Sequence, residues 1–140
     1  MRFLDTNIFV RHLAQDDAVR AAACRDLLSK VESGEEVVVT SGMVISEVVF
    51  LLESPRSYAL PRDMVRQMFE PLLDLRGMRI PDKALYKRAF ELHCAENIDF
   101  PDAYNAAYME ANGISEVYSY DRDFDRVEGI RRVEPGESLT

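Results

Sequence analysis

Acidic side chains in this sequence gather where predicted strands end or predicted helices begin. Asp5 closes an apolar run at the N-terminus, Glu47 lies in a helix-like stretch, and Asp102 follows a proline. Asp121 and Asp123 come directly after a further apolar run. Ligands of an open α/β sheet bind at the carboxyl ends of its strands, so acids from these four segments are expected to converge there. Such a cluster of oxygen ligands suits a hard cation such as Mg²⁺, as a metal-dependent phosphodiesterase requires.

Each of these acids also has a simpler explanation. Asp5 could cap a helix or occupy a turn, and Glu47 could lie at a helix edge and reach solvent. Asp102 follows Pro101 in a first helical turn, where the helix dipole alone stabilises a negative charge. Asp99, three residues earlier, could cap the same helix or support the site. From the residues taken singly, both kinds of interpretation stay open.

An alternation of strands and helices must position these side chains. Strands are predicted at residues 1–5, 36–40, 78–80, 117–120 and 130–133. Six helices are predicted: Thr6 to Leu13, Asp16-Asp17 to Gly34, Ser41 to Leu52, Pro61 to Gly77, Pro81 to Ala95, and Pro101 to Gly113, with Thr6 and Ser41 as caps. Ala23, Leu27, Leu28 and Val31 form the apolar stripe of the second. Pro71 is expected to cause a kink or a break in the fourth near Glu70. The alternation predicts the α/β class with a mainly parallel sheet.

Composition bounds the class of protein. With 140 residues, 47% apolar and 30% charged, the chain is expected to form a single globular domain over residues 1–140. No apolar run approaches the roughly 18 residues that span a bilayer, and no secretory signal is visible, so a cytoplasmic protein without membrane contact is expected. Cys24 and Cys94 have no companions at metal spacing and are expected to be buried thiols. His12 and His93 are isolated, and each is expected to have a surface or half-buried structural role rather than a catalytic one. The net charge of −8 disfavours a nucleic-acid binder unless bound cations reverse the local field.

The acids at 121, 123 and 125 resemble three other motifs, and none of them fits. A calcium-binding loop that begins at Asp121 requires Gly at its sixth position and Glu at its twelfth, where this chain has Arg126 and Arg132. Haloacid-dehalogenase-type phosphatases place Asp-x-Asp early in the chain, with Thr or Val where Asp125 stands. Receiver domains require a strand-end lysine that is not seen here. A site formed together with the earlier acids therefore remains.

Taken together and in order, the motifs resemble the PIN domain. Its marks are Asp5-Thr6-Asn7 after an N-terminal strand, Ser46-Glu47 about forty residues later, Phe100-Pro101-Asp102-Ala103, and Ser119-x-Asp121-x-Asp123-Phe124. The resemblance runs from Phe3 to about Val133, and the compact length is similar to that of the VapC toxins of type II toxin–antitoxin pairs. It departs from the family at Asn105, where an aliphatic residue is common. The resemblance implies a three-layer α/β/α sandwich with a mainly parallel sheet of about five strands.

The resemblance also implies a role for each motif residue. Asp5 and Asp102 would be the principal metal ligands, while Glu47 and Asp121 would complete the catalytic acids. Asp123 would act in an outer position or on a second ion. Ser119 would orient an acid or a water, and Asn7 would hold the site or contact substrate. Arg11, Arg56 and Arg122 could contact RNA phosphates, although a solvated surface position is the more common fate of any one arginine.

The function that this implies is a Mg²⁺-dependent endoribonuclease, with Mn²⁺ as an alternative ion, acting as the toxin of a VapBC-type pair. Its partners would be an RNA substrate, a cognate antitoxin protein and a second copy in a homodimer. Two alternatives remain open: a PIN-domain RNA-processing nuclease outside a toxin system, and a catalytically inactive PIN-fold module that binds RNA or protein. Retention of Asp5, Glu47, Asp102 and Asp121 disfavours the inactive module.

Overall fold

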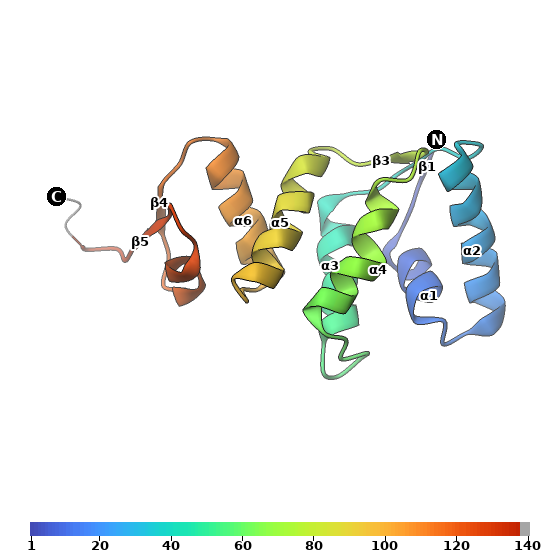
Figure 1. Cartoon of the computed structure of the whole chain (residues 1–140), viewed down its shortest axis with the longest axis horizontal. Coiled ribbons are helices and arrows are strands. Elements are labelled where there is room, and N and C mark those ends of the chain that lie inside the picture. Colours follow the sequence, from blue (N-terminus) through green and yellow to red (C-terminus); the bar gives the residue numbers. More distant parts are fainter. Residues whose placement is uncertain (138–140) are drawn as a thin grey trace. The chain divides into compact units, whose positions relative to one another are not determined.

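The computed structural model describes residues 1–137, shown as ribbons in Figure 1. Within this range the chain forms six α-helices, one 3₁₀ helix and five short strands. It divides into two compact units, the first covering Met1–Lys83 and the second beginning at Ala84.

The first unit contains a three-stranded parallel sheet. Its strands are β1 (Arg2–Phe3), β2 (Val38–Val39) and β3 (Met78–Arg79), paired in the order β1-β2-β3. Val38 and Met78 are almost fully buried, as expected of parallel strands that helices cover. The sheet places the end of β1, and Asp5 beyond it, at the carboxyl edge.

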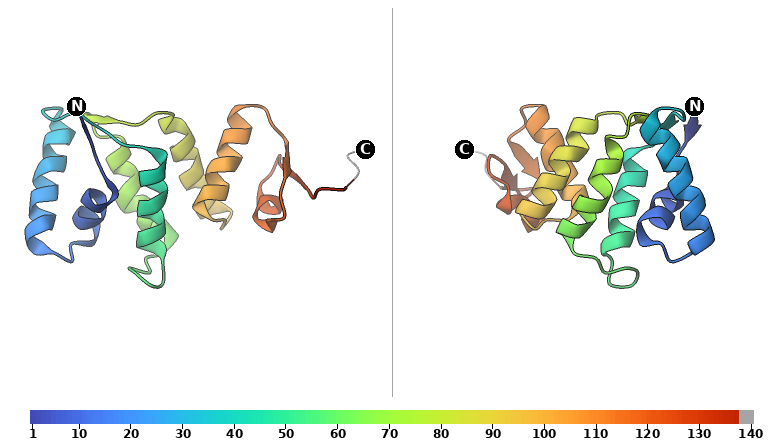
Figure 2. Two further views of the ribbon diagram at one scale, coloured as in Figure 1. Left: turned by 180° about the vertical axis from the view of Figure 1, so that it is seen from behind. Right: turned by 45° about the vertical axis from the view of Figure 1, so that its right-hand side comes forward.

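Four helices complete this unit: α1 (Thr6–Ala14), α2 (Ala18–Ser33), α3 (Gly42–Glu53) and α4 (Arg62–Leu73). Helix α1 packs against α2 and α3, which can be followed from behind in Figure 2. The rings of Phe9 and Phe69 meet edge to face with their centroids 5.2 Å apart, and both side chains are fully buried. This aromatic contact fixes α1 against α4 and thereby sets the direction in which the first turn of α1 points.

The second unit contains α5 (Lys83–Ala95), which begins at its boundary, α6 (Phe100–Ala111), β4 (Glu116–Tyr118), the 3₁₀ helix η1 (Arg122–Arg126) and β5 (Arg131–Val133). Strands β4 and β5 pair in parallel. The buried ring of Phe100 packs against Phe90 and, edge to face, against His93. His93 is itself buried, and its Nδ1 donates to the carbonyl of Ile98 at 2.5 Å. This contact is structural, but the predicted surface or half-buried position of the histidine is wrong, because its ring packs into the core beside Phe100.

Several local predictions are confirmed by capping geometry. The carboxylate of Asp17 accepts from the backbone N–H of Arg20, and the hydroxyl of Ser41 accepts from that of Val44. Gly34 ends α2 in the left-handed conformation with φ 83°. These residues are the capping types that the sequence offers at those points, which is why the helix boundaries were predictable.

Three predictions are wrong in detail. Thr6 is the first residue of α1 and Asp5 occupies the cap position, because the hydroxyl of Thr6 is engaged elsewhere. Pro71 does not break α4, because burial of Leu73 outweighs the one hydrogen bond that proline cannot donate; the helix ends at Leu73, before the predicted Gly77, and the alternative of a kink near Glu70 stays a prediction. Ala23 is exposed on α2, where Cys24 is buried one position further along.

The α/β class with parallel strands is confirmed. Three of the five strands lie in the first unit and two in the second, so a single five-stranded sheet and a single domain remain predictions. Cys24 is buried as predicted, while Cys94 is half-buried. No helix within residues 1–137 combines the length and the apolar character needed to cross a membrane.

Candidate metal centre

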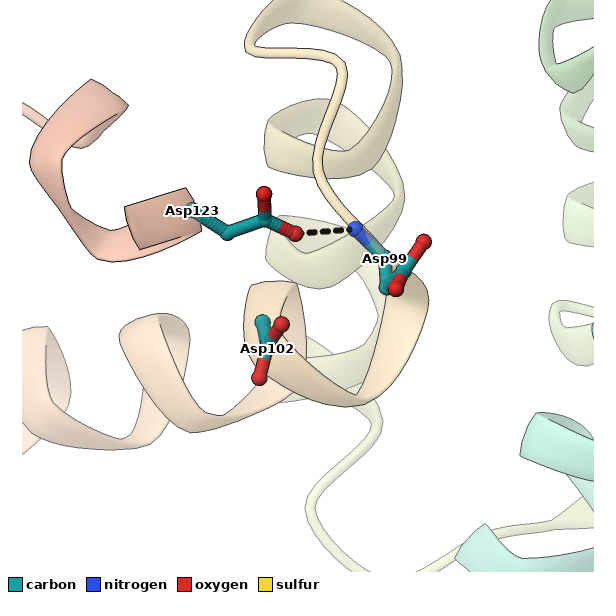
Figure 3. Close-up of side chains that lie close together, drawn as sticks. All are labelled: Asp99, Asp102 and Asp123. Atoms are coloured by element: carbon teal, nitrogen blue, oxygen red, sulfur yellow. Dashed lines mark hydrogen bonds between the residues drawn. The ribbon is translucent and has the colours of Figure 1, made fainter. Parts of the chain in front are cut away.

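Three carboxylates of the second unit converge at the N-terminus of α6. One oxygen from each of Asp99, Asp102 and Asp123 lies within 4.8 Å of the others. Figure 3 shows Asp99 just before α6, Asp102 one turn later, and Asp123 extending from η1. Oxygen ligands of one octahedral Mg²⁺ lie at most about 4.2 Å apart, so a small contraction would suit a hard cation. The donor set therefore fits the type of ion that the sequence predicts.

A chain of hydrogen bonds builds the loop that carries Asp123. The hydroxyl of Ser119 accepts from the backbone N–H of Asp121 at 2.9 Å, and the carboxylate of Asp121 accepts from that of Asp123 at 2.9 Å. Asp123 in turn accepts from the backbone N–H of Asp99 at 3.2 Å. Each polar side chain thus shapes the turn for the next residue, and the sequence places Asp123 against the start of α6.

A second contact ties η1 to the segment before α6. The guanidinium of Arg126 donates from Nη1 to the carbonyl of Asn97 at 2.8 Å. Together with the contact from His93 to Ile98, this holds residues 97–99 on both sides. Arg126 and His93 therefore fix the backbone before Asp99, in addition to the contact of Asp123 with the N–H of Asp99.

Asp125, the third acid of the segment 121–125, pairs with an arginine and does not face the acid cluster. Arg132 donates from Nε to a carboxylate oxygen of Asp125 at 3.0 Å, and from Nη1 to the carbonyl of Ser119 at 3.1 Å. The Arg132 side chain is only 12% exposed and also lies 3.5 Å from Glu134. Asp125 is therefore paired with a cation, whereas Asp123 turns toward the other acids. This agrees with the rejection of a calcium-binding loop.

The carboxyl of Asp102 is harder to ionise than that of an ordinary aspartate. Burial is the main cause that raises the pKa of Asp102 to about 7, and a hydrogen bond to the Asp121 side chain adds to it. The negative charges of Asp121, Asp123 and Asp99 raise it further. A bound cation reverses this situation because it favours the ionised form of every carboxylate around it.

In the first unit, Asp5 and Glu47 flank the start of α1. Asp5 stands at the cap position of α1, yet within the described residues its side chain makes no capping hydrogen bond, so simple capping does not explain it. The buried hydroxyl of Thr6 donates to Glu47 at 2.9 Å and joins two segments 41 residues apart. The hydroxyl of Thr40 donates to the carbonyl of Leu4 at 2.9 Å and fixes the end of β1 immediately before Asp5.

Asp5, Thr6 and Glu47 line a cleft in the first unit with a volume of about 570 Å³. The volume falls within the range of about 300–1,000 Å³ that is usual for ligand sites. Its lining includes the predicted site residues Asp5, Asn7 and Glu47. The other lining residues are Thr6, Val10, Arg11, Asp16, Leu51, Ser57 and Tyr58.

The structure thus groups the predicted residues within each unit. Asp5, Asn7 and Glu47 line one cleft; Asp102, Asp121, Asp123 and Ser119 meet at the start of α6. Asp99 is a full member of the acid cluster, whereas the sequence indicated only a cap or a supporting residue. Its spacing of three residues from Asp102 is the sequence feature that points to this position. The contact between Tyr58 and Asp16 was not predicted, since 42 residues separate them and no pattern links them.

Comparison with known proteins agrees with these motifs. The family model described as the PIN domain matches residues 2–130. The chain therefore belongs to the PIN domain family. A curated relative, the VapC ribonuclease of Aquifex aeolicus (strain VF5), is 24% identical over 137 residues, which cover 98% of each protein. A search of solved structures finds Mycobacterium tuberculosis VapC20, a toxin that cleaves the sarcin-ricin loop, at 26% identity and a TM-score of 0.40, covering 89% of this chain and 93% of that one.

Proposed function

We propose that this PIN-domain protein is a divalent-metal-dependent endoribonuclease that hydrolyses phosphodiester bonds of RNA. The observation that carries the proposal is the convergence of Asp99, Asp102 and Asp123 at one helix N-terminus in a chain of this family. The name of the Aquifex relative, a VapC ribonuclease similar over almost the whole chain, supports RNA as the substrate. Mg²⁺ is the proposed ion, with Mn²⁺ as an alternative.

The proposed ligands in the second unit are Asp102, with Asp99 or Asp123 beside it. Asp5, in the cleft of the first unit, is proposed as a ligand on its family motif alone. When bound, a divalent cation would acidify water and neutralise charge that develops on the phosphate. Within the chain, Thr6 holds Glu47 in one orientation through its hydroxyl hydrogen bond. Ser119 and Asp121 shape the turn that presents Asp123. The protein's share of catalysis is thus to preorganise carboxylates, so that little reorganisation is needed in the reaction.

The biological role that we propose is that of the toxin in a VapBC-type pair, with a cognate antitoxin as the protein partner and a homodimer as the working form. The net charge of −8 supports a partner with a basic or apolar segment that covers the acidic cleft. A small upstream reading frame with a DNA-binding N-terminus would support this role. Growth arrest on expression, relieved by that neighbour, separates a toxin from a housekeeping nuclease.

Cleavage of a structured RNA by the purified protein tests the activity. The wild type is expected to cut internally in Mg²⁺ and to stop when EDTA is added. Asp5→Asn should lose at least about 100-fold in rate, the size of effect seen when an electrostatic catalytic group is removed. Asp26→Asn, an exposed acid of α2 outside the cleft, is the matched control and should cut like the wild type. Equal rates for Asp5→Asn and the wild type would remove Asp5 from the proposed site.

A further inference from the structure

The cleft of the first unit has a wall that the proposed catalytic acids do not explain. Asp16, in the turn between α1 and α2, joins two side chains from distant segments. The guanidinium of Arg11 donates to one of its oxygens at 3.3 Å, and the hydroxyl of Tyr58 donates to the other at 2.7 Å. All three residues line the same cleft as Asp5 and Glu47.

We propose that Arg11 and Tyr58, held by Asp16, form the wall of this cleft that binds single-stranded RNA. Arg11 contacts a backbone phosphate, and the ring of Tyr58 stacks on a base of an adjacent nucleotide. The inference rests on the proposed ribonuclease function and names how that site holds its substrate.

The charges of the cleft make Arg11 significant. The lining contains three carboxylates, those of Asp5, Asp16 and Glu47, and Arg11 is the cation among its lining residues. A phosphate that enters is repelled by the acids unless a positive group compensates. The guanidinium has five N–H donors, and the contact with Asp16 that orients it leaves others for a phosphate. Its side chain is 33% exposed, which allows that contact.

Tyr58 is held in a way that suits stacking. Its hydroxyl is fixed on Asp16, and the hydrogen bond raises the pKa of the phenol, so the group stays a neutral donor. The side chain is half-buried, which leaves part of it accessible. A ring that is already immobilised loses little conformational freedom when a base stacks on it. Stacking of this kind is tolerant of sequence and is common in single-strand binding.

A purely structural role is the main alternative, since Asp16 could serve only to fasten the 54–60 loop to the α1–α2 turn. The two roles differ in what a substitution changes. A structural tie affects the unfolding temperature and leaves the salt dependence of RNA binding unaltered. A phosphate contact contributes to that dependence, because it releases counterions from the RNA.

The test measures binding of a fluorescent single-stranded RNA to the full chain, with Ca²⁺ in place of Mg²⁺, over a series of salt concentrations. Gels confirm that the RNA stays intact. Arg11→Gln should weaken binding and reduce the slope of log Kd against log salt by about 0.7, the value for one phosphate of a single strand. Tyr58→Leu should weaken binding about tenfold with the slope unchanged, whereas Tyr58→Phe, which keeps the ring, should stay within about threefold of the wild type.

Arg20→Gln is the matched control, because Arg20 also pairs with an aspartate, Asp17, but does not line the cleft. It should bind like the wild type. The inference is overturned if Arg11→Gln keeps the full slope, if Arg20→Gln loses as much, or if the wild type does not bind. If the wild type binds RNA in Ca²⁺ but cuts none in Mg²⁺, the proposed function fails while the binding wall stands.

Discussion

At the scale of single residues, Asp102 shows what the second unit is arranged to do. Its carboxyl is partly buried beside Asp99, Asp121 and Asp123, and burial is the main cause that raises its pKa. Ionising this carboxyl in the folded chain therefore costs free energy that an ordinary surface acid does not lose. Asp125 shows the contrast, because Arg132 neutralises it two residues from Asp123. A carboxyl whose ionised form is disfavoured, close to one that is paired with an arginine, supports a site that suits a bound cation.

The raised pKa of Asp102 predicts an unusual pH dependence of stability in EDTA. The folded chain takes up a proton at Asp102 near pH 7, whereas the unfolded chain does so only near the ordinary value of 3.8. This group therefore adds stability as the pH falls from about 8 to about 5. In Asp102→Asn the contribution is absent.

Thermal unfolding of both proteins in EDTA, at pH values from 5 to 8, checks this. The unfolding temperature of Asp102→Asn minus that of the wild type should be positive and should grow as the pH rises. A constant difference over that range would show that the carboxyl is not shifted as described.

Thr6 provides a second test at this scale. Thr6→Val keeps the shape of a side chain that is 6% exposed but removes the donor to Glu47. The variant is expected to lose about 1 kcal/mol of stability and about tenfold in RNA cleavage rate, because Glu47 is no longer held. Ser33→Ala is the control: it removes the hydrogen bond from the Ser33 hydroxyl to the carbonyl of Lys30 at the end of α2 and should leave the cleavage rate unchanged. A normal rate in Thr6→Val would separate this hydrogen bond from catalysis.

At the scale of elements, the short sheet depends on one close approach. Gly77 precedes β3, and its N–H donates to Val31 at 2.8 Å while its carbonyl accepts from Val38 at 2.9 Å. A Cβ at this position would collide with the backbone carbonyl of Glu36 and approach that of Val31 to 2.9 Å. Neither neighbour is a flexible side chain, so the backbone itself would have to move.

Gly77→Ala is therefore expected to destabilise the protein by about 2 kcal/mol or more in chemical denaturation. Gly113→Ala is the comparison: its Cβ meets nothing within 4 Å, and only its positive φ of 67° is unfavourable. That variant should lose about 1 kcal/mol. Equal losses in the two variants would mean that conformation, and not the collision, explains the need for glycine at 77.

Some helix boundaries could be predicted from sequence patterns alone, and others could not. Ser41, Asp17 and Gly34 bound their helices as predicted because capping is a local interaction. Thr6 and Pro71 were predicted wrongly because distant contacts decide them: Thr6 bonds to Glu47, and the turn that contains Pro71 is held by burial of Leu73. Propensity alone does not contain such tertiary terms.

At the scale of the whole molecule, the order of acids along the chain predicts the family from the sequence alone. Membership of the PIN domain family and the parallel α/β class are both confirmed. Contacts within the second unit also bring Asp102, Asp121 and Asp123 together. The hydrogen bonds that join Arg11 and Tyr58 to Asp16 were not predicted. Tyr58 and Asp16 are 42 residues apart, and their contact depends on how the loop at 54–60 folds back.

The most direct test of the central claim, that the acid cluster forms a catalytic metal centre, compares Asp102→Asn with Asp125→Asn in Mg²⁺-dependent RNA cleavage. Both remove one negative charge from neighbouring parts of the second unit, but only Asp102 belongs to the cluster. We expect Asp102→Asn to lose at least about 100-fold in rate and Asp125→Asn to stay within about threefold of the wild type. Wild-type activity in Asp102→Asn, or cleavage by the wild type that persists in EDTA, would contradict the account.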